Sequence, residues 1–175
     1  MTTPAHFFGG YAVLRATESF WGSKLLAQST RGRLFWFGMF ATIAVDLDVL
    51  YVGGIGNHHS VVTHFPFFWL MVSAAIFFAG MYRKSITVQS FAKVLLVATW
   101  THLALDLVGI TLGVYVLWPF SMQEFSITPL KVDFISEQAR LQYILSNPIV
   151  WIGDSVVVVI GVVRMLRDRL TRRKL

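Results

Sequence analysis

The chain has 175 residues, of which 55% are hydrophobic and 14% are charged, and its mean hydropathy is +0.63. Soluble domains carry about 25% charged residues, so this composition excludes an ordinary water-soluble enzyme and a disordered tail. The absence of cysteine excludes a disulfide scaffold and thiolate metal sites. The length is typical of one domain, so we expect residues 1–175 to form a single integral membrane domain.

Apolar segments follow one another along the chain. A short one runs from Pro4 to Thr17, and four long ones cover Leu34 to Gly53, His64 to Tyr82, Phe91 to Trp118 and Pro148 to Met165. Each long segment approaches or exceeds the roughly 20 residues that cross a hydrocarbon core, whereas the short one covers about 21 Å as a helix. We therefore predict an all-α polytopic membrane bundle with four long transmembrane helices and a short N-terminal membrane helix, partial or full.

The basic residues indicate how this bundle is oriented. The formal net charge is +6, and Lys and Arg gather before the first long segment, between the second and third, and in a tail at about 164–175. The positive-inside rule places these regions and the C-terminus in the cytoplasm. The tail is typical of an anchor to anionic lipid headgroups, so we expect membrane lipids as partners and no nucleic acid. We expect no signal peptide, since Met1 to His6 contains no Lys or Arg. The polar segment from Ser121 to Asn147 is expected to be a connector outside the membrane.

Histidines and carboxylates lie in or beside the apolar segments. They are His6, Asp46, Asp48, His58, His59, His64, His102, Asp106 and Asp154. Ionisable groups at membrane depth are costly and by default mark a functional site. Helix rise places most of them in the outer half of the bilayer, and His6 joins them if the short first helix runs inward. The sequence therefore predicts a site toward the outer, periplasmic half of an inner membrane.

His102 and Asp106 have i, i+4 spacing, which puts both side chains on one helix face. A metal ion can take an imidazole and a carboxylate from such a pair, but a hydrogen bond that settles two buried polar groups explains it equally well. Asp46 and Asp48 lie about 200° apart on a regular helix, so they cannot both face one point. Either the helix opens there, as Gly53 and Gly54 would permit, or one Asp is a ligand and the other supports it.

The segment from His58 to His64 precedes Pro66, which belongs in the first turn of a helix. Its histidines are therefore expected in a loop and a helix start, either as ligands or as an interfacial cluster without a metal. His58 has the weakest case. Asp154 is expected to be a helix-dipole partner or a hydrogen bonder within the bundle.

Imidazoles and carboxylates without thiolates suit a divalent metal, with zinc favoured and manganese possible by ligand type. The expected ligands are His6, Asp46, Asp48, His59, His64, His102 and Asp106. This set exceeds what one tetrahedral ion takes, which indicates two ions, or one ion with general-base partners. Asp48 and His59 are the expected catalytic residues.

These residues together resemble the membrane-bound metal-dependent hydrolases, including the LexA-binding inner-membrane hydrolases. The early His of that family corresponds to Ala5-His6-Phe7-Phe8-Gly9, and its Pro-Asp-x-Asp is similar to Val45-Asp46-Leu47-Asp48. Its later motifs are similar to His59-Ser60-Val61-Val62-Thr63-His64, to His102-Leu103-Ala104-Leu105-Asp106 and to Leu117-Trp118-Pro119. The chain departs from the pattern at Val45, which replaces proline, at Ser60 and Val61, which replace an Arg-Gly pair, and at Phe65, which replaces a usual Ser.

The resemblance implies a membrane-embedded metal-dependent hydrolase. A metal-activated water would attack a lipid or small amphiphilic phosphoester at the outer half of the bilayer. A lipid amide or ester hydrolase, a non-enzymatic divalent-metal or proton carrier and a subunit with a decayed site are the alternatives. The oligomeric state is left open.

Overall fold

The computed structural model describes residues 2–22, 24–48, 50, 61–108, 114–127, 142 and 146–172. The α-helices are α1 (Thr3–Ala16), α2 (Glu18–Trp21), α3 (Gln28–Ala44), α5 (Pro66–Tyr82), α6 (Ile86–Val108) and α8 (Pro148–Arg172), and the 3₁₀ helices are η1 (Val45–Asp48) and η3 (Val62–His64). Within these residues the β-type pairing is an isolated bridge between Val114 and Phe125. The predicted all-α class is confirmed for the part of the chain that the structure describes.

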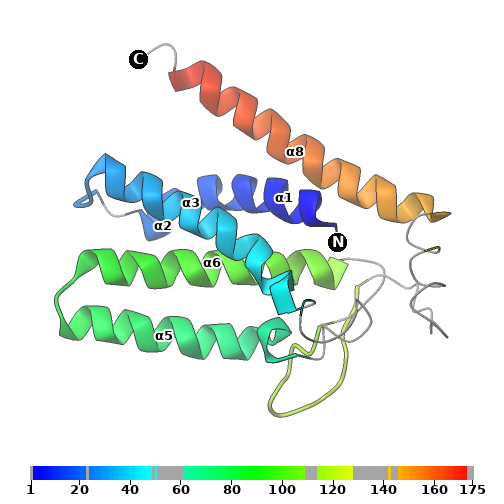
Figure 1. Cartoon of the computed structure of the whole chain (residues 1–175), viewed down its shortest axis with the longest axis horizontal. Helices are drawn as coiled ribbons and strands as arrows, with labels where there is room; N and C mark the ends of the chain where they lie inside the picture. The colour runs from blue at the N-terminus through cyan, green and yellow to red at the C-terminus, as the bar shows by residue number, and fades with distance from the viewer. Residues whose placement is uncertain are drawn as a thin grey trace.

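Helix α6 is the centre of the bundle, because it packs against α5, α3 and α1 (Figure 1). Helix α8 packs along α1 and forms the outer edge of the molecule. The largest core cluster fills the space between α1, α2, α3 and α6, and includes Tyr11, Leu14, Phe35, Met39 and Val94. This cluster fixes how α1 and α3 lie on the central helix.

Two aspartates of α8 hold α1 near its two ends. Asp154 accepts a hydrogen bond from the backbone N–H of Thr2 at 3.1 Å, just before α1 begins. Asp168 accepts one from the Tyr11 hydroxyl at 3.0 Å and lies 3.4 Å from Nε of Arg15. The later residue of α8 contacts the later residue of α1, so the two helices run in the same direction. Asp154 is therefore a hydrogen bonder within the bundle, one of the two roles expected for it.

The number of membrane-spanning helices differs from the prediction of four. Two described helices, α6 and α8, are long and apolar enough to cross a membrane. Helix α5 is apolar but has 17 residues, and α3 also has 17 and begins with the polar stretch Gln28–Arg33. Only 17% of the apolar window of α8 is buried inside the protein, which suits a helix that faces lipid.

Several predicted boundaries are also wrong. The segment predicted from Leu34 to Gly53 begins at Gln28, and its α-helix ends at Ala44. The segment predicted from Phe91 begins at Ile86, and Trp118 lies in a turn beyond the end of α6. Helix α8 continues past Met165 to Arg172, so most of the predicted basic tail is helical. Polar and charged residues extend these helices because apolar composition marks the membrane-embedded part of a helix and not its ends.

Helices α1 and α8 approach so closely at Gly161 that a side chain has no room there. A Cβ built on Gly161 would lie 2.4 Å from the carbonyl oxygen of Phe8. Gly153, two turns earlier on α8, has nothing within 4 Å of such an atom. The contact between the two helices therefore requires glycine at 161 and not at 153.

We predict that Gly161→Ala lowers the free energy of unfolding by about 1–3 kcal/mol, since the methyl group must push α8 away from α1. The matched variant Gly153→Ala should leave stability unchanged or raise it by up to about 1 kcal/mol, because alanine is the better helix former. Thermal unfolding of both variants in one detergent measures the difference. A Gly161→Ala protein as stable as the wild type would contradict the observed packing.

Candidate metal centre

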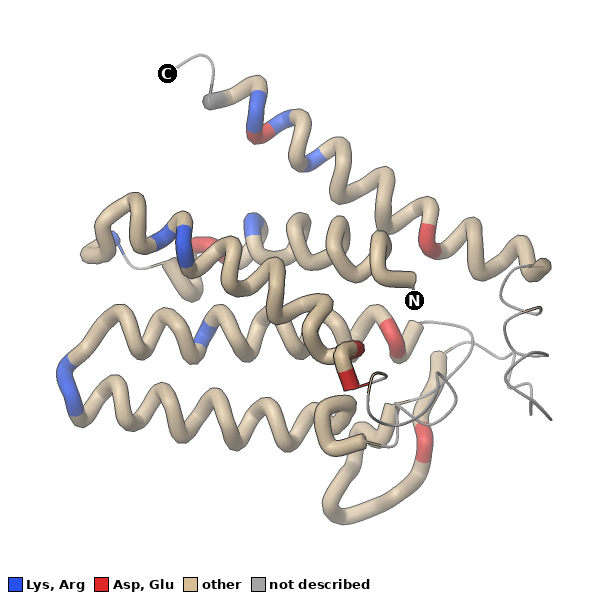
Figure 2. The backbone as a smooth tube through the Cα atoms, in the orientation of Figure 1, with Lys and Arg blue, Asp and Glu red and all other residues tan. Residues whose placement is uncertain are grey.

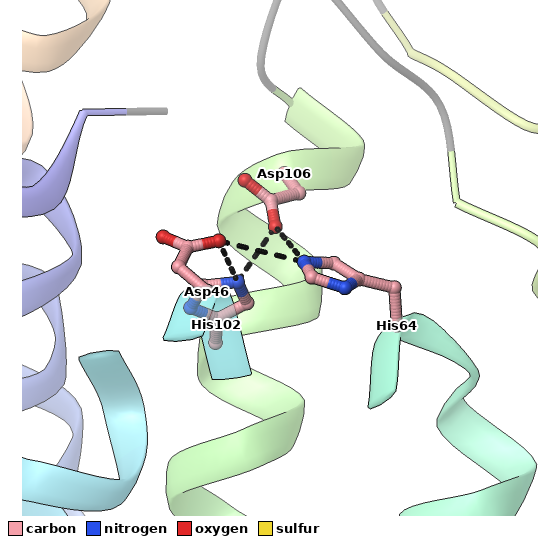
Figure 3. Close-up of side chains that lie close together, drawn as sticks. All are labelled: Asp46, His64, His102 and Asp106. Atoms are coloured by element: carbon pink, nitrogen blue, oxygen red, sulfur yellow. Dashed lines mark ion pairs between the residues drawn. The ribbon is translucent and has the colours of Figure 1, made fainter. Parts of the chain in front are cut away.

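Three chain segments bring two histidines and two aspartates together at one end of the bundle. Asp46 comes from η1, His64 from η3, and His102 and Asp106 from α6 (Figure 3). Each residue offers one ligand atom, and these four atoms all lie within 4.8 Å of one another. His64, His102 and Asp106 are buried, while the Asp46 side chain is 26% exposed. The group therefore has one edge that solvent can reach.

The distances between these atoms suit a single ion. Oδ1 of Asp46 lies 3.5 Å from Nε2 of His64 and 3.3 Å from Nε2 of His102. Oδ2 of Asp106 lies 3.9 Å from the first nitrogen and 2.9 Å from the second. Ligand atoms about 2.0–2.1 Å from a tetrahedral zinc ion lie about 3.4 Å apart. The four nitrogen–oxygen distances, 2.9–3.9 Å, are thus close to the separation of ligand atoms around such an ion.

The other ring nitrogen of each histidine fixes its tautomer. Nδ1 of His64 donates to Oδ2 of Asp48 at 3.0 Å, and Nδ1 of His102 donates to the carbonyl oxygen of Thr42 at 2.7 Å. These oxygens only accept, so each ring carries its proton on Nδ1, and Nε2 of a neutral ring is then an acceptor. Two such nitrogens and two carboxylate oxygens converge, and ligand atoms of these types fit a divalent cation.

The 3₁₀ turn after α3 explains how both aspartates contribute. On an α-helix Asp46 and Asp48 would lie about 160° apart by the shorter way round, but a 3₁₀ helix has three residues per turn and reduces this to about 120°. Asp46 faces the two Nε2 atoms, whereas Asp48 is buried and faces Nδ1 of His64. The hydroxyl of Thr63 also donates to Asp48. Asp46 thus belongs to the group of four, while Asp48 contacts one of its histidines from the far side; the ligand role expected for Asp48 stays a prediction.

His6 lies behind the two carboxylates and outside the group of four. Its Nε2 is 3.1 Å from Oδ1 of Asp106, and its Nδ1 is 3.6 Å from Oδ2 of Asp46. Its ring is fully buried and stacks on His102, with ring centroids 4.0 Å apart. His6 therefore contacts the oxygen atoms of Asp46 and Asp106 that point away from His64 and His102.

The two remaining predicted histidines, His58 and His59, lie outside the described residues. Two partners in the site were not predicted from the sequence, namely the carbonyl of Thr42 and the hydroxyl of Thr63. Thr63 stands within the motif that ends at His64, so its position beside that histidine was a usable signal. Thr42 contributes a backbone atom, which any residue type has, so its identity carries no such signal.

Aromatic side chains lie beside the site. The ring of Phe65 stacks on Trp118 with centroids 4.9 Å apart, and Trp69 donates its indole N–H to the carbonyl of Thr63 at 2.6 Å. Residues 114–127 end beside α6, since the N–H of Ile127 donates to the carbonyl of Leu107 at 2.9 Å. The described beginning of the predicted connector therefore packs against the end of α6 that carries Asp106.

Comparison with known proteins gives a family for the chain. Residues 1–167 match the family described as YdjM inner membrane protein. The chain belongs to this family. No curated protein and no solved structure matches the chain.

Membership of the YdjM inner membrane protein family agrees with the two helices that are long and apolar enough to span a bilayer. The predicted location in an inner membrane is thus supported by the family and by the structure. The hydrolase part of the resemblance, and the side of the membrane that the site faces, stay predictions.

We predict that the purified wild-type protein holds a divalent metal near one equivalent per chain, and that His102→Ala/Asp106→Ala removes it. Two of four ligands are lost in this variant, and removing even a supporting group costs about 10–100-fold in affinity. Elemental analysis of detergent-purified protein measures the content. Asp154→Asn is the matched control, because it changes a buried carboxylate outside the group and should keep its metal.

A folded wild-type protein that stays metal-free after incubation with zinc and with manganese would contradict the metal centre. The four side chains would then have to be held together by hydrogen bonds among the same nitrogens and oxygens.

Proposed function

We propose that this chain is a membrane metallohydrolase. In this proposal Asp46, His64, His102 and Asp106 hold one divalent ion, zinc in the first place and manganese as the alternative. The convergence of two imidazole nitrogens and two carboxylate oxygens within 4.8 Å of one another carries the proposal. Because four protein ligands would fill a tetrahedral ion, a water on the ion would have to be an additional ligand. A divalent ion would lower the pKa of such a water, making it a nucleophile, and would polarise the bond that is cleaved. The exposed edge at Asp46 is where a water and a substrate would reach the ion.

The protein residues have separate tasks in this proposal. Thr42 and Asp48 fix the His102 and His64 rings through Nδ1, which leaves Nε2 of each ring as the atom that can bind an ion. Asp48 is committed to His64 and Thr63, so we propose for it a positioning role in place of the catalytic role expected from the sequence. The ligand and catalytic roles expected for His59, which lies outside the described residues, stay predictions.

The depth of the site supports an amphiphilic substrate. Asp106 lies two residues before the end of α6, which is long enough to cross the membrane. The ligands therefore lie where the helix leaves the hydrocarbon core, at the level of lipid ester and phosphate groups. We propose a lipid-type phosphoester as the substrate class, with a lipid amide or ester as the alternative.

A carrier is a weaker proposal for the same residues, because it needs a route to the other side of the membrane. The bundle between the site and its opposite end is filled by the cluster that contains Leu14, Met39 and Val94. Such an apolar filling suits a site that opens toward one membrane surface.

We predict metal-dependent cleavage of a short-chain phospholipid by the purified protein in mixed micelles. Phosphatidylglycerol and phosphatidylcholine are the phosphoester probes, and a ceramide is the amide probe. Asp106→Asn should abolish turnover, and Asp154→Asn should preserve it. Mass spectrometry of the released headgroup measures the reaction. Metal-loaded protein that cleaves no phosphoester would contradict the proposed substrate class, and cleavage unaffected by Asp106→Asn would contradict the proposed centre.

We predict that Asp48→Asn lowers zinc affinity by about 10–100-fold without abolishing binding, because an amide is a poorer acceptor for Nδ1 of His64 than a carboxylate. Competition with a zinc chelator measures the affinity. Thr63→Val, which removes a donor to the same carboxylate, should have a smaller effect in the same direction. Thr99→Val is its control, since the Thr99 hydroxyl bonds to the backbone of its own helix. Equal affinities in wild type and Asp48→Asn would show that Asp48 does not support the metal ligand.

A further inference from the structure

A cavity of about 610 Å³ lies at the end of the bundle opposite the metal centre, between α1, α2 and the start of α3. We call it the arginine cavity. Its lining includes Arg15, Glu18, Gln28, Arg31, Phe35 and Trp36. Its volume is within the usual range for small-molecule sites. About 22 Å of helix separates Arg31 from Asp46, so the cavity is not part of the metal centre.

One arginine of the cavity is held by its neighbours. The Arg15 guanidinium lies 4.0 Å from the centre of the Phe35 ring, Nη1 is 3.1 Å from Glu18 and Nε is 3.4 Å from Asp168. Its side chain is only 15% exposed. Arg15 is therefore fixed in position, and its charge is largely offset by the two carboxylates.

The second arginine has no such partner. Among the described residues, no carboxylate pairs with Arg31, and its Nε is buried without a hydrogen bond. Arg31 lies in the first turn of α3, where no side chain caps the helix and no acidic residue is present. The N–H groups and the dipole of this helix start add positive potential to that of Arg31. Glu18, the acidic residue in the lining of the arginine cavity, pairs with Arg15, so Arg31 is the cation of the lining that no described carboxylate compensates.

The depth of the cavity corresponds to a lipid headgroup. Asp168, which contacts Arg15, lies three residues before the end of the membrane-spanning stretch of α8. Trp36, beside the cavity, is 62% exposed, and tryptophan is enriched at the membrane–water boundary. Lys and Arg gather at this end of the bundle, whereas the aspartates of the metal centre lie at the other (Figure 2).

We propose that the arginine cavity binds the phosphate group of an anionic phospholipid, with Arg31 as the cation that recognises it. The guanidinium of Arg31 donates to the phosphate oxygens, the start of α3 adds backbone donors, and Trp36 lies against the glycerol region. The site is independent of the metal centre and of the reaction proposed there.

The test uses full-length protein in a zwitterionic detergent and a titration with short-chain phosphatidylglycerol, followed by native mass spectrometry. Short-chain phosphatidylcholine and inorganic phosphate are titrated in parallel to separate an anionic lipid from a zwitterionic one and from a free anion. Arg31→Gln removes the cation, and Arg33→Gln is the matched control, because Arg33 is exposed on the same helix and does not line the cavity. The double variant His102→Ala/Asp106→Ala is titrated as well, to exclude lipid bound at the metal centre.

We expect wild type, Arg33→Gln and the double variant to bind phosphatidylglycerol alike and in preference to phosphatidylcholine. Arg31→Gln should bind it about tenfold more weakly, as for the loss of one charged hydrogen-bonding group. Competition by millimolar phosphate would identify the phosphate group itself as the element recognised. Equal affinity in Arg31→Gln and Arg33→Gln, or no preference for the anionic lipid in the wild type, would overturn the proposal. Loss of binding in the double variant would overturn it too, and would assign the lipid to the metal centre instead.

Discussion

Two imidazole nitrogens and two carboxylate oxygens converge on one point of this protein, and each is a hydrogen-bond acceptor in a neutral-histidine state. Acceptors at 2.9–3.9 Å repel one another unless a positive charge lies between them. Because the four come from η1, η3 and α6, a cation at this point would tie three separate segments together. The placement of the helix ends around it is the feature on which the proposed chemistry depends.

The packing of the helices fixes the positions of these helix ends. Helix α6 carries two of the four residues of the candidate site on one face, and α1 places His6 against the far oxygens of Asp46 and Asp106. Helix α1 is itself held by α8, through Asp154 and Asp168 near its two ends and through the close approach at Gly161. The outermost helix therefore contributes to the site through packing, although it contributes no ligand among the described residues.

Sequence periodicity was informative where the local structure is regular. The i, i+4 spacing of His102 and Asp106 predicted one helix face, and the side chains lie 2.9 Å apart on α6. Apolar composition predicted the helical class but overcounted the membrane-spanning helices, because it continues from α3 into η1, where the α-helix has already ended. The different contacts of Asp46 and Asp48 depend on that 3₁₀ turn, and no residue type in the sequence predicts such a turn. Interactions with backbone atoms, such as the bond from His102 to Thr42, were also beyond prediction from residue identity.

The length of α6 relates the two ends of the bundle to each other. Its 23 residues cover about 34 Å, close to the thickness of a hydrocarbon core, so groups at its two ends lie near opposite membrane surfaces. Carboxylates and imidazoles concentrate at one end, arginines at the other, and the apolar cluster around Leu14 and Val94 fills the space between. The ionisable groups thus lie near the ends of the bundle, and its middle avoids the cost of charges at the centre of a membrane. A bundle of this kind can hold a reactive site against one surface and a lipid-binding cavity against the other, with the apolar cluster filling the distance between them.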